Sequence, residues 1–527
     1  MSEENENVQT DCAKKTWTLI VFLAGDNNLS DEIISTLRSL KTIGDAGEGK
    51  INIIACYDSV YPTVKTRFYE FSNKKTLFGA SKETELSDYE ICLEDLPTSL
   101  QRVSDDESGT NQGDSLSEFT KYAIGHYKAD NYFLILSGHG DAFRGKTLMY
   151  DENPPGGISL QRLGQILRNS HSPAADSGED CAESERAKFA ILGFDNCAMG
   201  LLEIGFEFRR AAKYMLASEG FIPTSGWEYE QPLKWLLAHP TATPVELARR
   251  FVIEFENAQA DFALGGRSVD LSVCDLSRVD YVNVKLQRLG KTLYKIFEKY
   301  ETRSDREKYI QELFVRLISF SHWRAQTYFY EQTTDLFDFS KVLMDECNHY
   351  ADFMKAISPE IETAETPPGK IYRKLRKVAK RCRKILKQNI ENSDNRYVKE
   401  FGWSGPEFRF STGAAIFFPW TRLSFFSADD IYKRLKMSRS PFSEDSSYWY
   451  KFIDAYTLSS TRIPEHEEFV KDGGIKTGGQ FRTGGQFRDE LDIIKSYFAS
   501  YKNFPTDAKV RRMDSKRKSI EEIKKEN

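Results

Sequence analysis

Two residues in this chain of 527 residues carry the side chains that acyl transfer by a thiol requires, Cys197 and His139. Cys197 follows an apolar run, FAILG at 189–193, and the polar turn that comes after it. We expect a helix from about 199 to 212, which would place the thiol at a helix N-terminus, where partial positive charge favours the thiolate. The alternative is a buried structural cysteine, the usual state of an intracellular cysteine.

His139 stands between two glycines in the sequence SGHG, directly after the apolar run at 131–137. The glycines remove side-chain bulk and let a substrate backbone approach the imidazole. The backbone N–H groups of Gly140 and Cys197 are candidates for stabilising a developing oxyanion. The alternative is a strand-to-loop turn that contains a histidine by chance. The interval between His139 and Cys197 leaves room for one helix and a loop, so both residues would end adjacent strands and meet as a thiol and its proton-transfer partner.

Asp195 lies two residues before the candidate nucleophile. In an extended strand, residues two apart project to the same side. Asp195 either binds a basic side chain of the substrate or caps the helix that follows. A negative charge beside Cys197 would oppose thiolate formation, a cost that is explained if that charge binds substrate.

The apolar runs that position these residues alternate with helical patterns. We predict strands at 17–24, 51–57, 66–71, 131–137, 189–193 and 214–218, and helices that start at Ser30 and at Ser117. Further strands are expected at 269–274 and 414–418, and the rest of 276–460 is expected to be helical. This order predicts an α/β fold with a mostly parallel sheet flanked by helices. In such sheets, functional groups gather beyond the carboxyl ends of the strands, where 25–28, 138–140 and 195–197 all lie.

The motifs at these strand ends, taken in order, resemble the clostripain-like family of cysteine peptidases. The matching segments are GDNNL at 25–29, SGHG at 137–140, FDNCAMG at 194–200, ASE at 217–219, GWEY at 226–229, LSVCDL at 271–276 and GAAIFFP at 413–419. The resemblance implies a caspase-type α/β fold and a catalytic dyad of Cys197 and His139. It also implies cleavage after Arg or Lys, with Asp195 lining the primary pocket.

The resemblance also implies a second acidic pocket residue, which falls on Glu230, where the family more often has Asp. The alternative for Glu230 is a solvated acid at the start of a helix. Family members are often zymogens activated by cleavage between the His and Cys strands. The acidic loop at 170–188 lies in that interval, and Arg168, Arg186 and Lys188 are the candidate processing sites. An activating protease is a second route to the same cleavage.

The composition also limits which partners, cofactors and location are expected. The net charge is −6, from 73 basic and 79 acidic residues, so no global attraction to nucleic acid or to an anionic membrane is expected. The eight cysteines include no CxxC pair, and no EF-hand loop occurs, so no metal or other cofactor is predicted, although the resemblance suggests calcium. No signal peptide or membrane-spanning run is recognised, which makes the cytoplasm the expected location.

We divide the chain into a disordered tail (1–15), a caspase-like catalytic domain (16–285), a mainly helical region that completes the fold (286–460) and a charged flexible tail (461–527). The last part contains the hexapeptide TGGQFR twice, at 477–482 and 483–488. Residues 370–387 form a basic amphipathic helix, which either contacts an anionic partner or presents a solvated face. Two alternatives to a peptidase stay open, a non-catalytic caspase-like scaffold and a regulatory interaction protein.

Overall fold

The structure is a computed structural model. It describes residues 14–47, 49–61, 65–72, 85–105, 112–140, 148–152, 155–170, 189–259, 268–298, 305–328, 333–390, 395–420 and 447–460. Residues 1–13 of the predicted N-terminal tail, the C-terminal tail with its hexapeptide repeat and the loop at 171–188 therefore lie outside the described residues. The predicted tail boundary at 15 is one residue too late, because Lys15 already belongs to the first strand.

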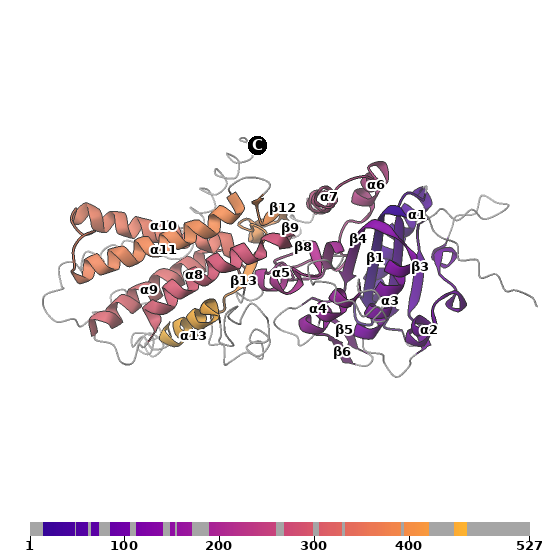
Figure 1. Ribbon diagram of the computed structural model, residues 1–527, viewed down its shortest axis with the longest axis horizontal. Helices are drawn as coiled ribbons and strands as arrows, with labels where there is room; N and C mark the ends of the chain where they lie inside the picture. Colours follow the sequence, from indigo (N-terminus) through magenta and orange to yellow (C-terminus); the bar gives the residue numbers. More distant parts are fainter. Residues whose placement is uncertain are drawn as a thin grey trace, which may run out of the picture.

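Eight strands form one mixed sheet in the order β12-β9-β8-β7-β4-β1-β2-β3 (Figure 1). Their bounds are β1 (Lys15–Gly25), β2 (Asn52–Ser59), β3 (Arg67–Glu70), β4 (Ala129–Ser137), β7 (Phe189–Asp195), β8 (Ala212–Ala217), β9 (Val269–Asp275) and β12 (Val398–Ser404). The pairs β1-β2, β1-β4, β4-β7 and β7-β8 are parallel, which confirms the predicted α/β class. The pairs β2-β3, β8-β9 and β9-β12 are antiparallel.

Helices cover both faces of this sheet, which explains why its central strands are almost continuously apolar. All seven residues of β7 are buried. One face packs against α1 (Ser30–Ala46), α6 (Glu230–Ala238) and α7 (Pro244–Ala258), where Val21 and Leu37 share a core. The other face packs against α2 (Thr98–Asp105), α3 (Gln112–His126), α4 (Leu160–Asn169) and α5 (Leu202–Phe208). On that side the rings of Phe22 and Phe119 lie 6.4 Å apart.

A helical bundle lies beside the end of the sheet that carries β9 and β12 (Figure 1). It comprises α8 (Val279–Phe297), α9 (Asp305–Arg324), α10 (Leu336–Ile357), α11 (Pro367–Ile390) and α13 (Tyr448–Ser460). Its apolar side chains belong to the same continuous core as Phe22 and Leu192 of the sheet. The bundle and the sheet therefore share one core on this side, where the rings of Trp449 and Phe418 meet edge to face with 5.4 Å between their centroids.

Smaller elements connect these layers. A three-stranded sheet contains β10 (Thr327–Tyr328), β11 (Thr333–Asp335) and β13 (Ala415–Phe417), and β5 (Leu148–Glu152) pairs with β6 (Pro155–Ile158). Short 3-10 helices are η1 (Leu86–Tyr89), η2 (Leu93–Asp95), η4 (Leu276–Arg278) and η7 (Pro406–Phe408). The expectation that the rest of 276–460 is helical is therefore wrong at β10, β11 and β12. These strands are too short, or too polar, to give a buried-strand pattern.

Candidate active site

The carboxyl ends of three neighbouring strands bring the predicted residues to one edge of the sheet. Ser137, the last residue of β4, is the register partner of Asp195, the last residue of β7. On its other side β4 pairs with β1, where Leu23 is opposite Ser137. His139 and Cys197 each come two residues after this matched pair, so they occupy equivalent positions beyond adjacent strand ends, as the spacing predicts.

The two turns that carry His139 and Cys197 contact one another through the backbone. Asn196 donates from Nδ2 to the carbonyl oxygen of Gly138 at 2.6 Å. A Cβ on Gly140 would lie 2.4 Å from the carbonyl oxygen of Cys197 and 3.0 Å from its nitrogen. Gly140 is therefore required for this close approach, and its backbone lies against that of Cys197. The oxyanion role assigned to the two N–H groups remains a prediction.

Cys197 lies in a constrained turn rather than at a helix N-terminus. The expectation of a helix from 199 is wrong, because α5 begins only at Leu202. Leu201 instead forms a bridge with Ala415, whose N–H donates to the carbonyl oxygen of Gly200 at 2.9 Å, and this tether holds the chain extended. Since the field of a helix terminus falls off within a turn, α5 does not account for thiolate stabilisation at Cys197.

The Cys197 sulfur instead lies against the backbone of Ile222. The N–H of Ile222 points at the Cys197 sulfur, with 3.4 Å between nitrogen and Sγ. The thiol is partly exposed, which leaves it accessible. The next residue, Ala198, has φ of 54°, in the left-handed region that a non-glycine residue rarely adopts. Its N–H donates to the carbonyl of Gly220 at 2.7 Å, so this strained turn is held against the same segment, 220–222.

His139 is exposed at the edge of the site, and its ring contacts the loop that follows β1. Its Nε2 lies 2.6 Å from Oδ1 of Asn28. Its carbonyl oxygen accepts a hydrogen bond from the N–H of Met149 at 3.0 Å, which fixes the backbone behind the ring. The turn at 25–28 was expected at this edge, but no pattern in the sequence indicates that Asn28 would contact the imidazole.

Asp195 is almost completely buried, with 4% of its surface exposed. Tyr229 donates its hydroxyl to Oδ2 at 2.7 Å, and Ser137 donates to the same atom at 3.3 Å. Oδ1 is buried without a hydrogen-bond partner of good geometry in the described part of the chain. Burial raises the pKa of Asp195 from 3.8 to about 6, while its hydrogen bonds, first that from Tyr229, act in the opposite direction. The structure does not use Asp195 to cap α5, which starts seven residues later.

Gly226 allows the chain to pass directly over this carboxylate. A Cβ there would lie 2.7 Å from Oδ2 of Asp195, and Gly226 has φ of 73°, which a side chain would strain. The predicted segment GWEY thus forms the wall beside Asp195, through Gly226 and Tyr229. Tyr229 was not foreseen as the partner of Asp195, because a tyrosine between two glutamates gives no signal of a contact with a distant strand end.

Glu230, the predicted second pocket acid, is the first residue of α6 and forms an ion pair with Lys234 one turn later. Its side chain is 34% exposed. Glu230 thus lies at the start of a helix, where its negative charge stabilises the N-terminus of α6. No described contact joins it to Asp195, and its role in substrate binding stays a prediction.

The candidate processing sites fall in two places. Arg168 lies in the last turn of α4, where its guanidinium is 3.9 Å from the buried carboxylate of Glu207. A protease can cleave after Arg168 only if this turn unwinds, because peptidases bind extended backbone. Arg186 and Lys188 lie outside the described residues.

Among the described residues, no group of three or more His, Cys, Asp or Glu is arranged to hold a metal ion. None of the described helices is both long enough and apolar enough to cross a membrane.

The model of the clostripain family, Peptidase C11, matches residues 21–454 of this chain. Clostripain from Hathewaya histolytica is 24% identical over 241 residues, and this alignment covers 41% of each chain. Two solved structures are similar at 15% identity and a TM-score of 0.47. One is a secreted C11 cysteine protease from Bacteroides thetaiotaomicron (84% of this chain and 99% of that one covered), and the other is an inactive zymogen C11 protease from Parabacteroides distasonis (80% and 97%). Because the family model spans most of the chain, including every strand end described above, this protein belongs to the clostripain family.

Proposed function

We propose that this protein is a cysteine endopeptidase that cleaves after Arg or Lys, with Cys197 as nucleophile and His139 as its proton-transfer partner. The observation that carries the proposal is the pairing of Ser137 with Asp195, which sets both turns at the same level of the sheet edge. Membership of the clostripain family supports the same reaction.

The reaction proceeds through an acyl-enzyme. The thiol of Cys197 loses its proton to His139, and the sulfur attacks the substrate carbonyl carbon. The N–H groups of Gly140 and Cys197 stabilise the resulting oxyanion. His139 then donates the proton to the leaving amine as the peptide bond breaks. A water molecule, deprotonated by His139, attacks the thioester and releases the new carboxylate, and the proton returns to the sulfur. No cofactor takes part in these steps.

Asp195 supplies the preference for a basic residue before the cut. Its Oδ1 atom is buried and has no hydrogen-bond partner of good geometry among the described residues. A guanidinium or ammonium that reaches this oxygen forms a charge-assisted hydrogen bond, worth about 1.5–3 kcal/mol. The cation also offsets the desolvation that raises the pKa of the carboxyl, so binding of substrate and ionisation of Asp195 favour each other.

Activation by cleavage in the loop at 170–188 is part of the same proposal. Arg186 and Lys188 are the preferred sites, because Arg168 is held in α4. The clostripain relatives include a protein described as an inactive zymogen. Mass spectrometry of the purified wild type and of Cys197→Ala tests this step. Fragments that end at Arg186 or Lys188 in the wild type alone support self-processing, whereas the same fragments in both proteins indicate another protease.

A panel of fluorogenic peptides that end in Arg, Lys, Asp or Asn tests the activity itself. We expect cleavage of the Arg and Lys peptides by the processed wild type and none by Cys197→Ala. Absence of cleavage of every peptide by fully processed protein would overturn the proposal in favour of a non-catalytic scaffold. Cleavage that persists in Cys197→Ala would indicate a contaminating protease.

A further inference from the structure

Two rows of cations lie on the neighbouring helices α8 and α11 of the bundle, remote in sequence from the candidate active site. Arg288, Lys291 and Lys295 follow the spacing i, i+3, i+7 on α8, and this spacing places them on one face of the helix. The second row, with the same spacing on α11, consists of Lys374, Lys377 and Arg381. The basic character of α11 was evident from the sequence, whereas the matching row on α8 is interleaved with apolar residues and gives no basic run.

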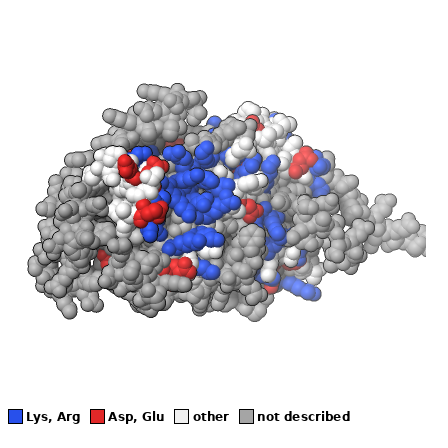
Figure 2. Space-filling view, turned by 60° about the vertical axis from the view of Figure 1, so that its left-hand side comes forward, with Lys and Arg blue, Asp and Glu red and all other residues white. Residues whose placement is uncertain are grey.

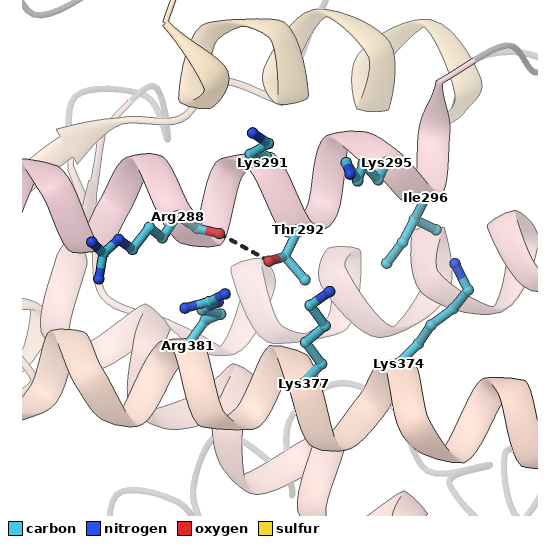
Figure 3. A pocket seen from close by; sticks show the side chains of 8 residues that line it. All are labelled: Arg288, Lys291, Thr292, Lys295, Ile296, Lys374, Lys377 and Arg381. Atoms are coloured by element: carbon cyan, nitrogen blue, oxygen red, sulfur yellow. Dashed lines mark hydrogen bonds between the residues drawn. The ribbon is translucent and has the colours of Figure 1, made fainter. Parts of the chain in front are cut away.

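The two rows line a common hollow of about 350 Å³ between the helices. In Figure 3, Arg288 lies opposite Arg381 and Lys295 opposite Lys374, so the helices run antiparallel and the rows are in register. Among the described residues, Thr292 and Ile296 complete the lining, so that this part of it contains six cations and no carboxylate. The volume falls within the range of about 300–1,000 Å³ that is typical of small-molecule sites.

The positive charge extends beyond the hollow. Figure 2 shows a broad area of Lys and Arg side chains on the bundle side of the molecule, with acidic side chains at its margins. Desolvation, and then the charges of Arg381, Lys380, Arg288 and Lys285, lower the pKa of Lys384 from its usual 10.5. Like charges at helical spacing repel one another and destabilise a helix. Cations are thus concentrated on this part of a chain whose net charge is −6.

We propose that this hollow binds a compact polyphosphate anion, that is, a small molecule that carries several phosphate groups close together. Six cations in a small concave space match several negative charges in an equally small volume. Arginine can bind phosphate oxygens in a bidentate manner, and lysine contributes point charges that adapt to the ligand. A monovalent anion would match only one of these six charges.

The same observations argue against macromolecular polyanions. Single-stranded nucleic acid is held by aromatic rings on which its bases stack, and none of the described residues that line the hollow is aromatic. An acidic peptide carries at most one charge per residue on a flexible side chain, so few of its carboxylates fit into a space of about 350 Å³. Both classes nevertheless serve as comparison ligands in the test.

Titration calorimetry on the full chain with sodium tripolyphosphate tests the proposal, in the Cys197→Ala background so that no self-cleavage occurs. The test variant Lys377→Gln with Arg381→Gln removes one lysine and one arginine from the hollow. The control variant Arg383→Gln with Lys387→Gln removes the same two charges from exposed positions of the same helix that do not line it. Orthophosphate at equal ionic strength and a short single-stranded RNA are the comparison ligands.

We expect saturable binding of tripolyphosphate with a strong salt dependence, because bound cations must release their counterions. The test variant should bind tripolyphosphate at least about tenfold more weakly than its parent. The control variant should bind it with the affinity of its parent. Thermal melting checks both folds: without ligand the test variant should melt at the same temperature as its parent or higher, because repulsion is reduced. Equal affinity in both double variants, or no saturable binding, would overturn the proposal and leave a solvated charged face. Tighter binding of RNA than of tripolyphosphate would overturn it in favour of nucleic acid.

Discussion

The Nε2 atom of His139 lies 2.6 Å from Oδ1 of Asn28, so the loop after β1 sets the orientation of the imidazole at the end of β4. An amide oxygen only accepts hydrogen bonds, and Nε2 must therefore carry the proton in this pair. In the neutral imidazole, Nδ1 then has the lone pair, and in the proposed mechanism this nitrogen receives the thiol proton. In that mechanism Asn28 is a positioning residue, because its contact is with His139.

Replacing Asn28 with Ala should lower kcat about 10- to 100-fold and leave KM nearly unchanged, because the imidazole loses the partner that selects its tautomer and orientation. The measurement is steady-state cleavage of an Arg peptide by processed enzyme. Asn169→Ala, at an exposed position near the end of α4, is the matched control and should retain full activity. An unchanged kcat in Asn28→Ala would show that the contact does not orient the base.

Asp195→Asn should abolish the preference for basic residues while it preserves the fold. Asparagine keeps an oxygen that accepts from Tyr229 and Ser137, but it lacks the charge that a guanidinium needs. We expect kcat/KM for the Arg peptide to fall about 10- to 1,000-fold, equivalent to one or two charge-assisted hydrogen bonds. A neutral peptide, such as one ending in Asn, provides the reference for general damage to the site. Equal losses for both peptides would mean that Asp195 does not read the substrate charge.

Glu230→Gln distinguishes the two interpretations of the second acid. Because Glu230 is paired with Lys234 on an exposed helix turn, we expect less than a threefold change in kcat/KM for Arg and for Lys peptides. The rates of the two peptides, measured side by side with the Asp195→Asn enzyme, decide the matter. A selective loss of Arg cleavage would assign Glu230 to the pocket after all.

Asp195 also makes stability depend on pH. Since burial raises its pKa from 3.8 to about 6, the folded protein binds more protons than the unfolded chain between these values, and the free energy of unfolding falls as pH rises from about 4 to 6. Above pH 6 the ionised carboxylate costs at most about 3 kcal/mol, the equivalent of two pKa units. The Asp195→Asn variant has no carboxyl group at this position and therefore does not bear this cost. We therefore expect it to gain stability relative to its parent as pH rises through this window.

Urea unfolding of the Cys197→Ala protein, with and without Asp195→Asn, measures this difference. Burial also raises the pKa of Asp58 and Asp270 to about 6 and that of Glu203 to about 7. These groups are common to both proteins and cancel in the comparison. A constant difference in stability from pH 4 to 8 would show that Asp195 titrates alike in the folded and unfolded states.

The sequence predicts the parts of the site that depend on strand periodicity. The buried runs before Gly138 and Asp195 place both turns at the carboxyl edge, since parallel strands bury both faces and read as continuous apolar segments. What periodicity cannot reveal are contacts across the edge, such as Tyr229 with Asp195 and Ile222 with Cys197. These depend on how loops fold back over strand ends, and either residue reads in sequence as an ordinary core or surface position.

The start of α5 shows a second limit. The segment after Cys197 has a helical composition, yet a bridge between Leu201 and Ala415, more than two hundred residues apart, keeps its first residues extended. Long-range pairing overrides local helix propensity here. The row of cations on α8 was missed for a related reason, because only the packing of α8 against α11 turns three separate residues into one surface.

The backbone contact between Gly140 and Cys197 yields the last prediction. A Cβ at position 140 would lie 2.4 Å from the carbonyl oxygen of Cys197, a contact that is relieved only if the backbone of one of the two turns shifts. Gly140→Ala should therefore lower kcat/KM about 100-fold or more, as expected when an oxyanion donor moves out of place.

Gly125→Ala is the matched control for that substitution. Gly125 is exposed near the end of α3, and no atom lies within 4 Å of the added methyl group. Because alanine favours the helix, stability should stay the same or rise by up to about 1 kcal/mol, with full activity. Activity assays and thermal melts of the two variants separate a local displacement from a general loss of fold. If Gly140→Ala retained the activity of Gly125→Ala, the backbone at 140 would not contribute to the reaction, and the oxyanion would have to be stabilised by other donors near Cys197.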